Sequence, residues 1–260
     1  MRTLKSCVVL FLFLVVARLG IAQEITVAAA SDLQFAFHDV GERFEKDTGK
    51  HLKLIFGSSG NFFAQLQNGA PFDVFFSADI EYPRRLEAAG LTVPGTLYPY
   101  ATGRIVLWVP TQSKLDLNRG LQVLLDPAIH KIAIANPEHA PYGRAAVAAL
   151  RHQNLYDQVS ARLVLGENIS QTATFVVSGN ADIGIVALSL AVAPSMKDKG
   201  RYVEVPVADY PPIEQAAVVL KSSAHQDIAR QFIEYLKTPA IQELLRGYGF
   251  TVPEEAKPGH

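Results

Sequence analysis

Short apolar runs alternate with amphipathic stretches along the first half of the chain. Three strands and three helices are predicted in turn, over residues 25–30, 33–48, 52–56, 62–67, 73–76 and 81–89. In the first helix Phe37, Val40 and Phe44 recur at helical spacing, and Gly49 ends the repeat. This alternation predicts a parallel sheet covered by helices, which is an α/β fold.

The second half continues the same alternation. Further strands are predicted over residues 105–109, 132–135, 161–165, 183–186, 202–205 and 216–220, and further helices over 142–152, 170–178, 228–236 and 241–248. Pro239 stands at the start of the last helix, a position that proline favours. The pattern by itself does not distinguish one α/β lobe from two.

The first 22 residues have the pattern of a secretory signal peptide. Arg2 and Lys5 precede an apolar run over Val8–Val16, and small residues before Gln23 offer a cleavage site. A membrane anchor is the alternative, but the run is shorter than the roughly 20 residues that span a bilayer, and Arg18 follows it. We therefore predict residues 1–22 as a cleaved signal peptide and a soluble, periplasmic mature protein.

Charge and cysteine content exclude some classes of partner and of chemistry. Residues 1–22 hold three cations and no anion, so their removal takes the net charge from −1 to −4 and also removes Cys7, the only cysteine. An acidic mature chain argues against nucleic acid as a partner. Without cysteine it needs no disulfide or thiolate chemistry. An anion site in such a chain has to depend on local geometry and not on overall charge.

Two strand–turn–helix segments in the first half are candidate anion sites, because helix N-termini present free N–H groups and a positive dipole end. Ser31 follows the first strand at the expected N-cap, where a plain capping serine is the alternative. Gly57 and Gly60 bracket Ser58 and Ser59, so backbone N–H groups can approach a ligand closely and the hydroxyls add donors. A flexible turn is the alternative for this second segment.

Two similar segments lie in the second half. In the loop over residues 136–144, Pro141 suits a helix start, and Tyr142 offers either its N–H or its hydroxyl. His139 has no second histidine at metal-ligand spacing and is predicted to be structural, and Arg144 to make a surface ion pair. In the segment 166–171, Ile169 offers a backbone N–H at the start of the next helix.

No catalytic set is visible in the sequence. It contains no Gly-x-Ser-x-Gly elbow, P-loop or dinucleotide glycine fingerprint, and its seven histidines are scattered. Three carboxylates in or near these segments, Glu138, Glu167 and Asp182, have no partner that the sequence assigns. We predict that the chain is not an enzyme and needs no cofactor; an exported α/β hydrolase is the less favoured alternative.

Several strings together resemble the molybdate-binding proteins of bacterial ABC transporters. The matching strings occur in the same order as in that family, from about residue 24 to residue 252. They cover residues 25–31, 56–59, 69–79, 136–143 and 248–250. The most specific strings are Gly-Ala-Pro-x-Asp-x-x-x-Ser-Ala-Asp at 69–79 and Pro-Glu-His-x-Pro-x-Gly at 137–143.

The resemblance implies a two-lobed periplasmic binding protein of the type II, Venus-flytrap kind, with a mixed, mainly parallel sheet in each lobe and the ligand in the interlobe cleft. Residues 23–103 and 214–260 would form lobe I, and residues 104–213 lobe II. The implied ligand is molybdate or tungstate, the implied partner is a membrane permease, and the implied state is a monomer. Sulfate or another small anion in the same fold is the alternative.

The resemblance also implies a ligand set. Ser31 and Ser59 would donate hydroxyl and N–H groups, and Tyr142 and Ile169 would donate N–H groups from the other lobe, with Ser58, Gly57, Pro141 and Ala187 in support. Some relatives have a tyrosine where this chain has Ala187, and Tyr142 is the suggested replacement for its hydroxyl. No protein atom would bind the molybdenum itself. Molybdate and tungstate carry no proton at neutral pH and need donors only, whereas a carboxylate would suit phosphate.

Overall fold

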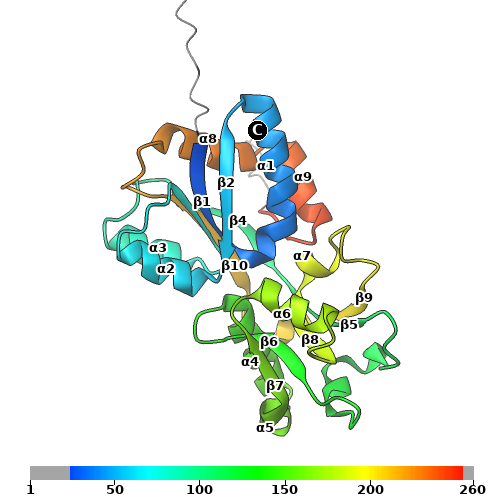
Figure 1. Ribbon diagram of the computed structural model, residues 1–260. Helices are drawn as coiled ribbons and strands as arrows, with labels where there is room; N and C mark the ends of the chain where they lie inside the picture. The colour runs from blue at the N-terminus through cyan, green and yellow to red at the C-terminus, as the bar shows by residue number, and fades with distance from the viewer. Residues whose placement is uncertain (1–23, 254–260) are drawn as a thin grey trace, which may run out of the picture.

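Two five-stranded sheets, each covered by helices, form two lobes stacked end to end (Figure 1). The computed structural model describes residues 24–253, so the predicted signal peptide and Cys7 lie outside the described residues. The predicted α/β fold with a mainly parallel sheet in each of two lobes is confirmed. No helix in the described range is long and apolar enough to cross a bilayer.

Lobe I is built on the sheet of order β2-β1-β3-β10-β4. Its strands are β1 (Glu24–Ala30), β2 (His51–Gly57), β3 (Val74–Ser77), β4 (Tyr98–Gly103) and β10 (Ile213–Val219). Its helices are η1 (Ser31–Leu33), α1 (Gln34–Thr48), α2 (Ser59–Gln67), α3 (Glu81–Ala88), α8 (Gln226–Leu236) and α9 (Pro239–Gly247). Strand β10 runs antiparallel to both of its neighbours, and the other strands run in one direction.

Lobe II is built on the sheet of order β7-β6-β8-β5-β9. Its strands are β5 (Ile105–Pro110), β6 (Ile132–Ala135), β7 (Leu163–Gly166), β8 (Ile183–Ala187) and β9 (Gly200–Glu204). Its helices are η2 (Leu117–Leu125), α4 (Pro141–His152), α5 (Tyr156–Val159), η3 (Ser160–Arg162), α6 (Ile169–Val177), α7 (Leu188–Ala191) and η4 (Val207–Asp209). Here β5 is the antiparallel strand.

The chain passes between the sheets twice. It leaves the first sheet after Gly103 and enters the second at Ile105, and it returns between Glu204 and Ile213. At the first crossing Arg104 Nη1 lies 2.9 Å from Glu204 Oε2, which joins the two connections. The C-terminal helices α8 and α9 therefore cover lobe I, although they follow lobe II in the sequence (Figure 1).

Local composition explains two of the differences between the predicted and the observed elements. Strand β4 was not predicted, because its sequence begins with Tyr98-Pro99 and lacks an apolar run. It is an edge strand, where proline is tolerated. The strand predicted from residue 161 begins at Leu163, since Ser160–Arg162 forms a 3₁₀ turn.

Aromatic packing fixes the first helix on the lobe I sheet. Phe37 lies fully buried against Phe76 of β3 and Phe232 of α8, with ring centroids 4.9 Å and 5.9 Å away in edge-on geometry. The helical spacing of Phe37, Val40 and Phe44 places all three in this core. The start of α1 is thereby held at the carboxyl end of β1.

Gly143→Ala is expected to destabilise lobe II. A Cβ at Gly143 would lie 2.1 Å from the carbonyl oxygen of Ala135 and 2.7 Å from its carbonyl carbon, which are backbone atoms of β6. Overpacking of this kind costs about 1–3 kcal/mol or more. Thermal unfolding should show a clearly lower Tm than in Gly41→Ala, whose new methyl group would meet only the side chains of Leu54 and Leu52, at 3.5 Å and 3.8 Å. Equal melting temperatures would contradict this packing.

Candidate ligand-binding site

A small enclosed pocket lies between the lobes, at the starts of four helical segments. Segments η1 and α2 follow β1 and β2 of lobe I, and α4 and α6 follow β6 and β7 of lobe II. Ligands in open α/β sheets bind at such carboxyl strand ends. The space open to the centre of a water molecule is about 10 Å³, which is about what one water molecule needs. The pocket is lined by Ala30, Ser31, Asp32, Gly57, Ser58, Ser59, Ala78, Ala140, Pro141, Tyr142 and Ile169.

The structure brings together seven of the eight residues named from the sequence. Those that line the pocket are Ser31, Ser59, Tyr142, Ile169, Ser58, Gly57 and Pro141. Ala187 does not line it; this residue ends β8, pairs with Ile105 and precedes α7. The residues come together because each predicted turn stands at the cleft end of its strand.

Two serine hydroxyls are available on the lobe I side. Ser59 is fully buried, and its Oγ accepts a hydrogen bond from the N–H of Ala78 at 2.9 Å. Its own hydroxyl hydrogen is therefore left for another acceptor. Ser31 is 3% exposed, and its Oγ lies 3.4 Å from the N–H of Ser170, at the long limit of a hydrogen bond.

Two backbone N–H groups complete the donors on the lobe II side. Tyr142 is the second residue of α4 after Pro141, and Ile169 is the first residue of α6. The N–H groups of a first helical turn have no partner within the helix. The Asn168 side chain caps α6 through the N–H of Gln171 at 3.0 Å, which leaves the N–H of Ile169 uncapped by that side chain.

The Tyr142 hydroxyl does not replace the hydroxyl that is missing at Ala187. It donates to Asp32 Oδ2 at 2.9 Å and accepts from Gln215 Nε2 at 3.0 Å. Gly103 makes room for it, because a Cβ there would lie 2.1 Å from the hydroxyl oxygen. Tyr142 is thus left with its N–H as a donor to the pocket.

Asp32 is the polar pocket residue that sequence reasoning missed; the other lining residues not named from the sequence are the alanines at 30, 78 and 140. It is 1% exposed, and its Oδ2 accepts from Tyr142 and, at 2.7 Å, from Gln215 Nε2. Its Oδ1 has no hydrogen-bond partner among residues 24–253. Burial raises the pKa of this carboxyl from 3.8 to about 6, against the lowering effect of its hydrogen bonds. In the sequence, an aspartate in a first helical turn looks like an ordinary favourable charge at the dipole.

Direct contacts hold the two lobes together around the pocket. The N–H of Gly60 donates to the carbonyl of His139 at 2.9 Å, and Ser58 Oγ lies 2.9 Å from His139 Nδ1. Arg144 Nη2 lies 2.5 Å from Asp79 Oδ2 across the cleft. His139 therefore has the structural position predicted for it. Arg144 makes an ion pair as predicted, but between the lobes.

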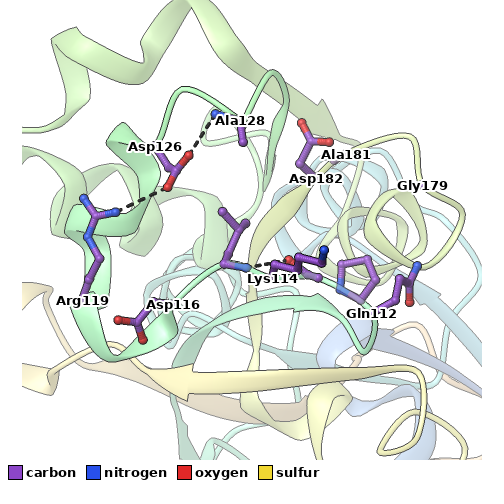
Figure 2. A pocket seen from close by; sticks show the side chains of 12 residues that line it. Gln112, Lys114, Asp116, Arg119, Asp126, Ala128, Gly179, Ala181 and Asp182 are labelled. Atoms are coloured by element: carbon purple, nitrogen blue, oxygen red, sulfur yellow. Dashed lines mark hydrogen bonds and ion pairs between the residues drawn. The ribbon is translucent and has the colours of Figure 1, made fainter.

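A larger cavity, drawn in Figure 2, lies in lobe II, at the end of the sheet away from the cleft. It measures about 580 Å³, and its aspartates and its arginine are engaged with one another or with backbone. Arg119 lies 3.5 Å from Asp126. Asp182 Oδ2 accepts from the N–H groups of His130 and Lys131 at 2.8 Å and 2.9 Å. Its polar groups do not converge on a common point as those of the interlobe pocket do.

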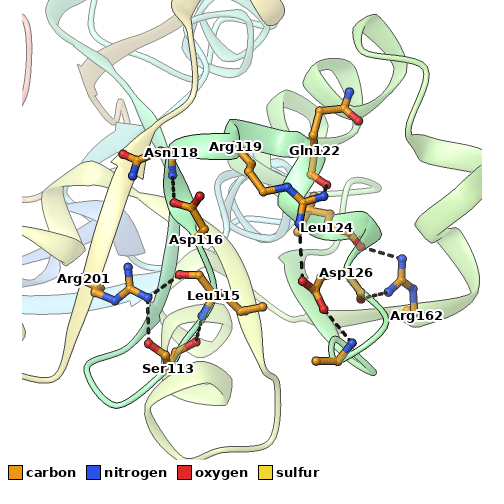
Figure 3. Close-up of polar contacts among 11 residues, drawn as sticks. Ser113, Leu115, Asp116, Asn118, Arg119, Gln122, Leu124, Asp126, Arg162 and Arg201 are labelled. Carbon is orange, nitrogen blue, oxygen red and sulfur yellow. Dashed lines mark hydrogen bonds and ion pairs between the residues drawn. The ribbon is translucent and has the colours of Figure 1, made fainter.

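The polar network beside this cavity is structural (Figure 3). Arg201 donates to the carbonyls of Ser113 and Leu115 at 2.8 Å and 2.5 Å, and Arg162 donates to that of Leu124 at 2.7 Å. These bonds fasten the segment around η2 to the rest of lobe II. Among residues 24–253, no group of three or more His, Cys, Asp or Glu side chains could hold a metal ion.

The matching family model and the most similar relatives agree with one another. The family model described as "Bacterial extracellular solute-binding protein" matches residues 25–251. The chain is 40% identical to the molybdate-binding protein ModA of Azotobacter vinelandii over 88% of this chain and 90% of that protein. It is 37% identical to ModA of Rhodobacter capsulatus over 88% of each.

Solved structures agree with the sequence matches. The Azotobacter vinelandii periplasmic molybdate-binding protein superposes with a TM-score of 0.84 at 36% identity, covering 88% of this chain and all of that one. The sulfate-binding protein SubI of Mycobacterium tuberculosis has a TM-score of 0.70 at 18% identity, covering 90% and 88% of the two chains. At that identity the second match shows the shared fold alone.

Proposed function

Because the chain belongs to the bacterial extracellular solute-binding protein family, we propose that it binds molybdate or tungstate between its lobes and delivers the oxyanion to an ABC transporter. The relatives that are 37–40% identical over most of the chain carry the name molybdate-binding protein. The observation that carries the proposal is the convergence of Ser31, Ser59, Tyr142 and Ile169 on one pocket.

The donors suit a bare oxyanion. Ser31 and Ser59 supply hydroxyls, and Tyr142 and Ile169 supply N–H groups at helix starts, so each donor is uncharged. Among the described residues, no lysine or arginine lines the pocket. Neutral donors avoid the desolvation cost of buried counter-charges, and the helix dipoles add favourable potential. A fully deprotonated tetrahedral dianion is the ligand that such a site recognises.

Binding would be coupled to closure of the lobes. The donors come from both lobes, so one anion contacts all four only when the lobes meet, as they do at Gly60 and His139. A ligand that prefers the closed form shifts the open–closed equilibrium toward it. The closed form then presents a defined surface of both lobes to the transporter.

The remaining features follow from this role. Residues 1–22 would direct export and be removed, and the mature chain would act in the periplasm as a monomer beside its membrane permease. The role requires neither a cofactor nor catalysis. Molybdenum would be held only through the oxygens of its oxyanion.

Isothermal titration calorimetry tests the proposal. The protein without residues 1–22 is expected to bind sodium molybdate and sodium tungstate with one site each, and to give little heat with sulfate or phosphate. Sulfate is also a donor-only ligand, so its exclusion would depend on the size of the cleft. Equal heats for molybdate and phosphate would contradict the proposal.

Hydrogen phosphate is a second candidate, favoured by one observation. Asp32 lines the pocket, and an ionised carboxylate there would accept the proton that hydrogen phosphate carries. The same titration distinguishes the two ligands, since this alternative predicts strong heat from phosphate and weak heat from molybdate.

A further inference from the structure

We propose that Asp32 is a further ligand-binding residue: it binds as the neutral acid and donates its Oδ1 hydrogen to the oxyanion, so that binding takes up one proton from solvent. This inference rests on the proposed binding of molybdate. It assigns a donor role to the one acidic side chain in a pocket otherwise lined by uncharged residues.

The hydrogen bonds around Asp32 place this proton on one atom. The two side-chain donors that reach the carboxyl group, the Tyr142 hydroxyl and the Gln215 amide, both donate to Oδ2. The Gln215 amide is oriented by Tyr100, whose hydroxyl donates to Gln215 Oε1 at 2.7 Å, so Gln215 Nε2 faces Asp32. Because Oδ2 accepts two hydrogens, a neutral Asp32 carries its own hydrogen on Oδ1. That atom is buried and has no other partner among the described residues.

No cation compensates the charge of an ionised Asp32. Its titratable neighbours are Tyr142 of α4 and Tyr100 of β4, and burial raises the pKa of both hydroxyls, so they stay neutral. The segments α6 and α7, which pack on η1, contain no charged residue. Arg144 of α4 is paired with Asp79.

The charged residues on the other elements packed around Asp32 do not compensate its charge either. The charged residues of β2 and β10 are His51, Lys53 and Glu214. His51 and Lys53 begin β2, at the opposite end of that strand from the pocket, and Glu214 is exposed beside Gln215. On α1, His38 and Asp39 are exposed. None of these side chains forms an ion pair or hydrogen bond with Asp32.

A bound dianion would strengthen the preference for the neutral acid. The pKa of Asp32 is already raised to about 6 by burial. A second negative charge in the same pocket disfavours ionisation further. Binding near neutral pH therefore converts an ionised carboxylate to the acid. Because the acid form becomes scarcer as pH rises above its pKa, the affinity for molybdate falls with rising pH, by up to about tenfold per unit.

Proton uptake on binding is the direct test. Molybdate is titrated into the protein at about pH 8 in two buffers that differ in ionisation enthalpy, and the difference in heat gives the protons exchanged. Uptake of close to one proton is expected for the unmodified chain, with a dissociation constant that rises roughly tenfold between about pH 7 and pH 8. Asp32→Asn keeps a donor at this position without a titrating group. It is expected to take up no proton and to bind up to about 100-fold more tightly than the unmodified chain at about pH 8, which is about two units above the pKa of Asp32.

Asp209→Asn is the matched control, since Asp209 is also a buried carboxylate but bonds Gln153 away from the pocket. It should keep the proton uptake of the unmodified chain. Binding of molybdate with no uptake by the unmodified chain overturns the inference even if Asp32→Asn does not fold. Equal uptake by Asp32→Asn also overturns it. Failure to bind molybdate at any pH overturns the proposed function, and the inference with it.

Discussion

Replacing both Ser31 and Ser59 by alanine is expected to weaken molybdate binding by at least about 100-fold, because hydrogen bonds to a charged partner contribute about 1.5–3 kcal/mol each and 1.4 kcal/mol is tenfold. Both hydroxyls lie in the pocket, and that of Ser59 has its hydrogen free because its oxygen already accepts from Ala78. Alanine at either position leaves one oxygen of the anion without its donor. Titration calorimetry gives the change directly.

The folding stability of the same variants has to be measured as well, because a loss of stability could be mistaken for a loss of affinity. Ser59→Ala also leaves the N–H of Ala78 without its acceptor, which costs about 1–3 kcal/mol of folding free energy. Thermal unfolding without ligand separates this loss from the loss of affinity. The matched double variant Ser160→Ala and Ser178→Ala removes two exposed hydroxyls outside the pocket and should bind normally. Unchanged affinity in the Ser31 and Ser59 double variant would exclude these hydroxyls as ligands.

Gly60→Ala is expected to weaken binding by about 10- to 100-fold through lobe closure, since overpacking of this size costs about 1–3 kcal/mol. A Cβ at Gly60 would lie 2.6 Å from the carbonyl oxygen and 2.9 Å from the Cα of His139 in the other lobe. It would also meet the hydroxyl end of Tyr82 at 2.8 Å, and that flexible side chain can move. The open form has no such interlobe clash, so the unliganded protein should melt at nearly its usual temperature.

Small-angle X-ray scattering tests whether the lobes of the Gly60→Ala variant close when molybdate is added. Molybdate should reduce the radius of gyration of the unmodified protein and leave that of Gly60→Ala nearly unchanged. Gly247→Ala is the control, because a Cβ there meets no atom within 4 Å. Full closure and normal affinity in Gly60→Ala would show that the Gly60–His139 contact does not limit closure.

The sequence predicted the parts of the site that depend on local chemistry. Gly57, Ser58 and Ser59 stand together in one turn, and Pro141 starts its helix, so these helix starts could be identified without a structure. The parallel order of the strands then places such turns at one edge of a sheet. The mainly parallel sheets followed from the same alternation of strand and helix.

The parts that depend on distant residues could not be predicted in this way. Asp32 bonds Tyr142 and Gln215, which lie 110 and 183 positions away in the sequence. No local pattern marks either partner, and Gln215 lies in the middle of a strand that reads as apolar. The commitment of the Tyr142 hydroxyl to Asp32 is likewise a property of the closed lobes, which local spacing does not contain.

A crystal structure of the mature chain with molybdate tests the central claim most directly. The account predicts one anion between the closed lobes, with its oxygens in hydrogen-bond contact with the hydroxyls of Ser31 and Ser59 and with the N–H groups of Tyr142 and Ile169. A lysine, an arginine or a protein-bound metal ion touching the anion, or an anion bound outside this pocket, would contradict it.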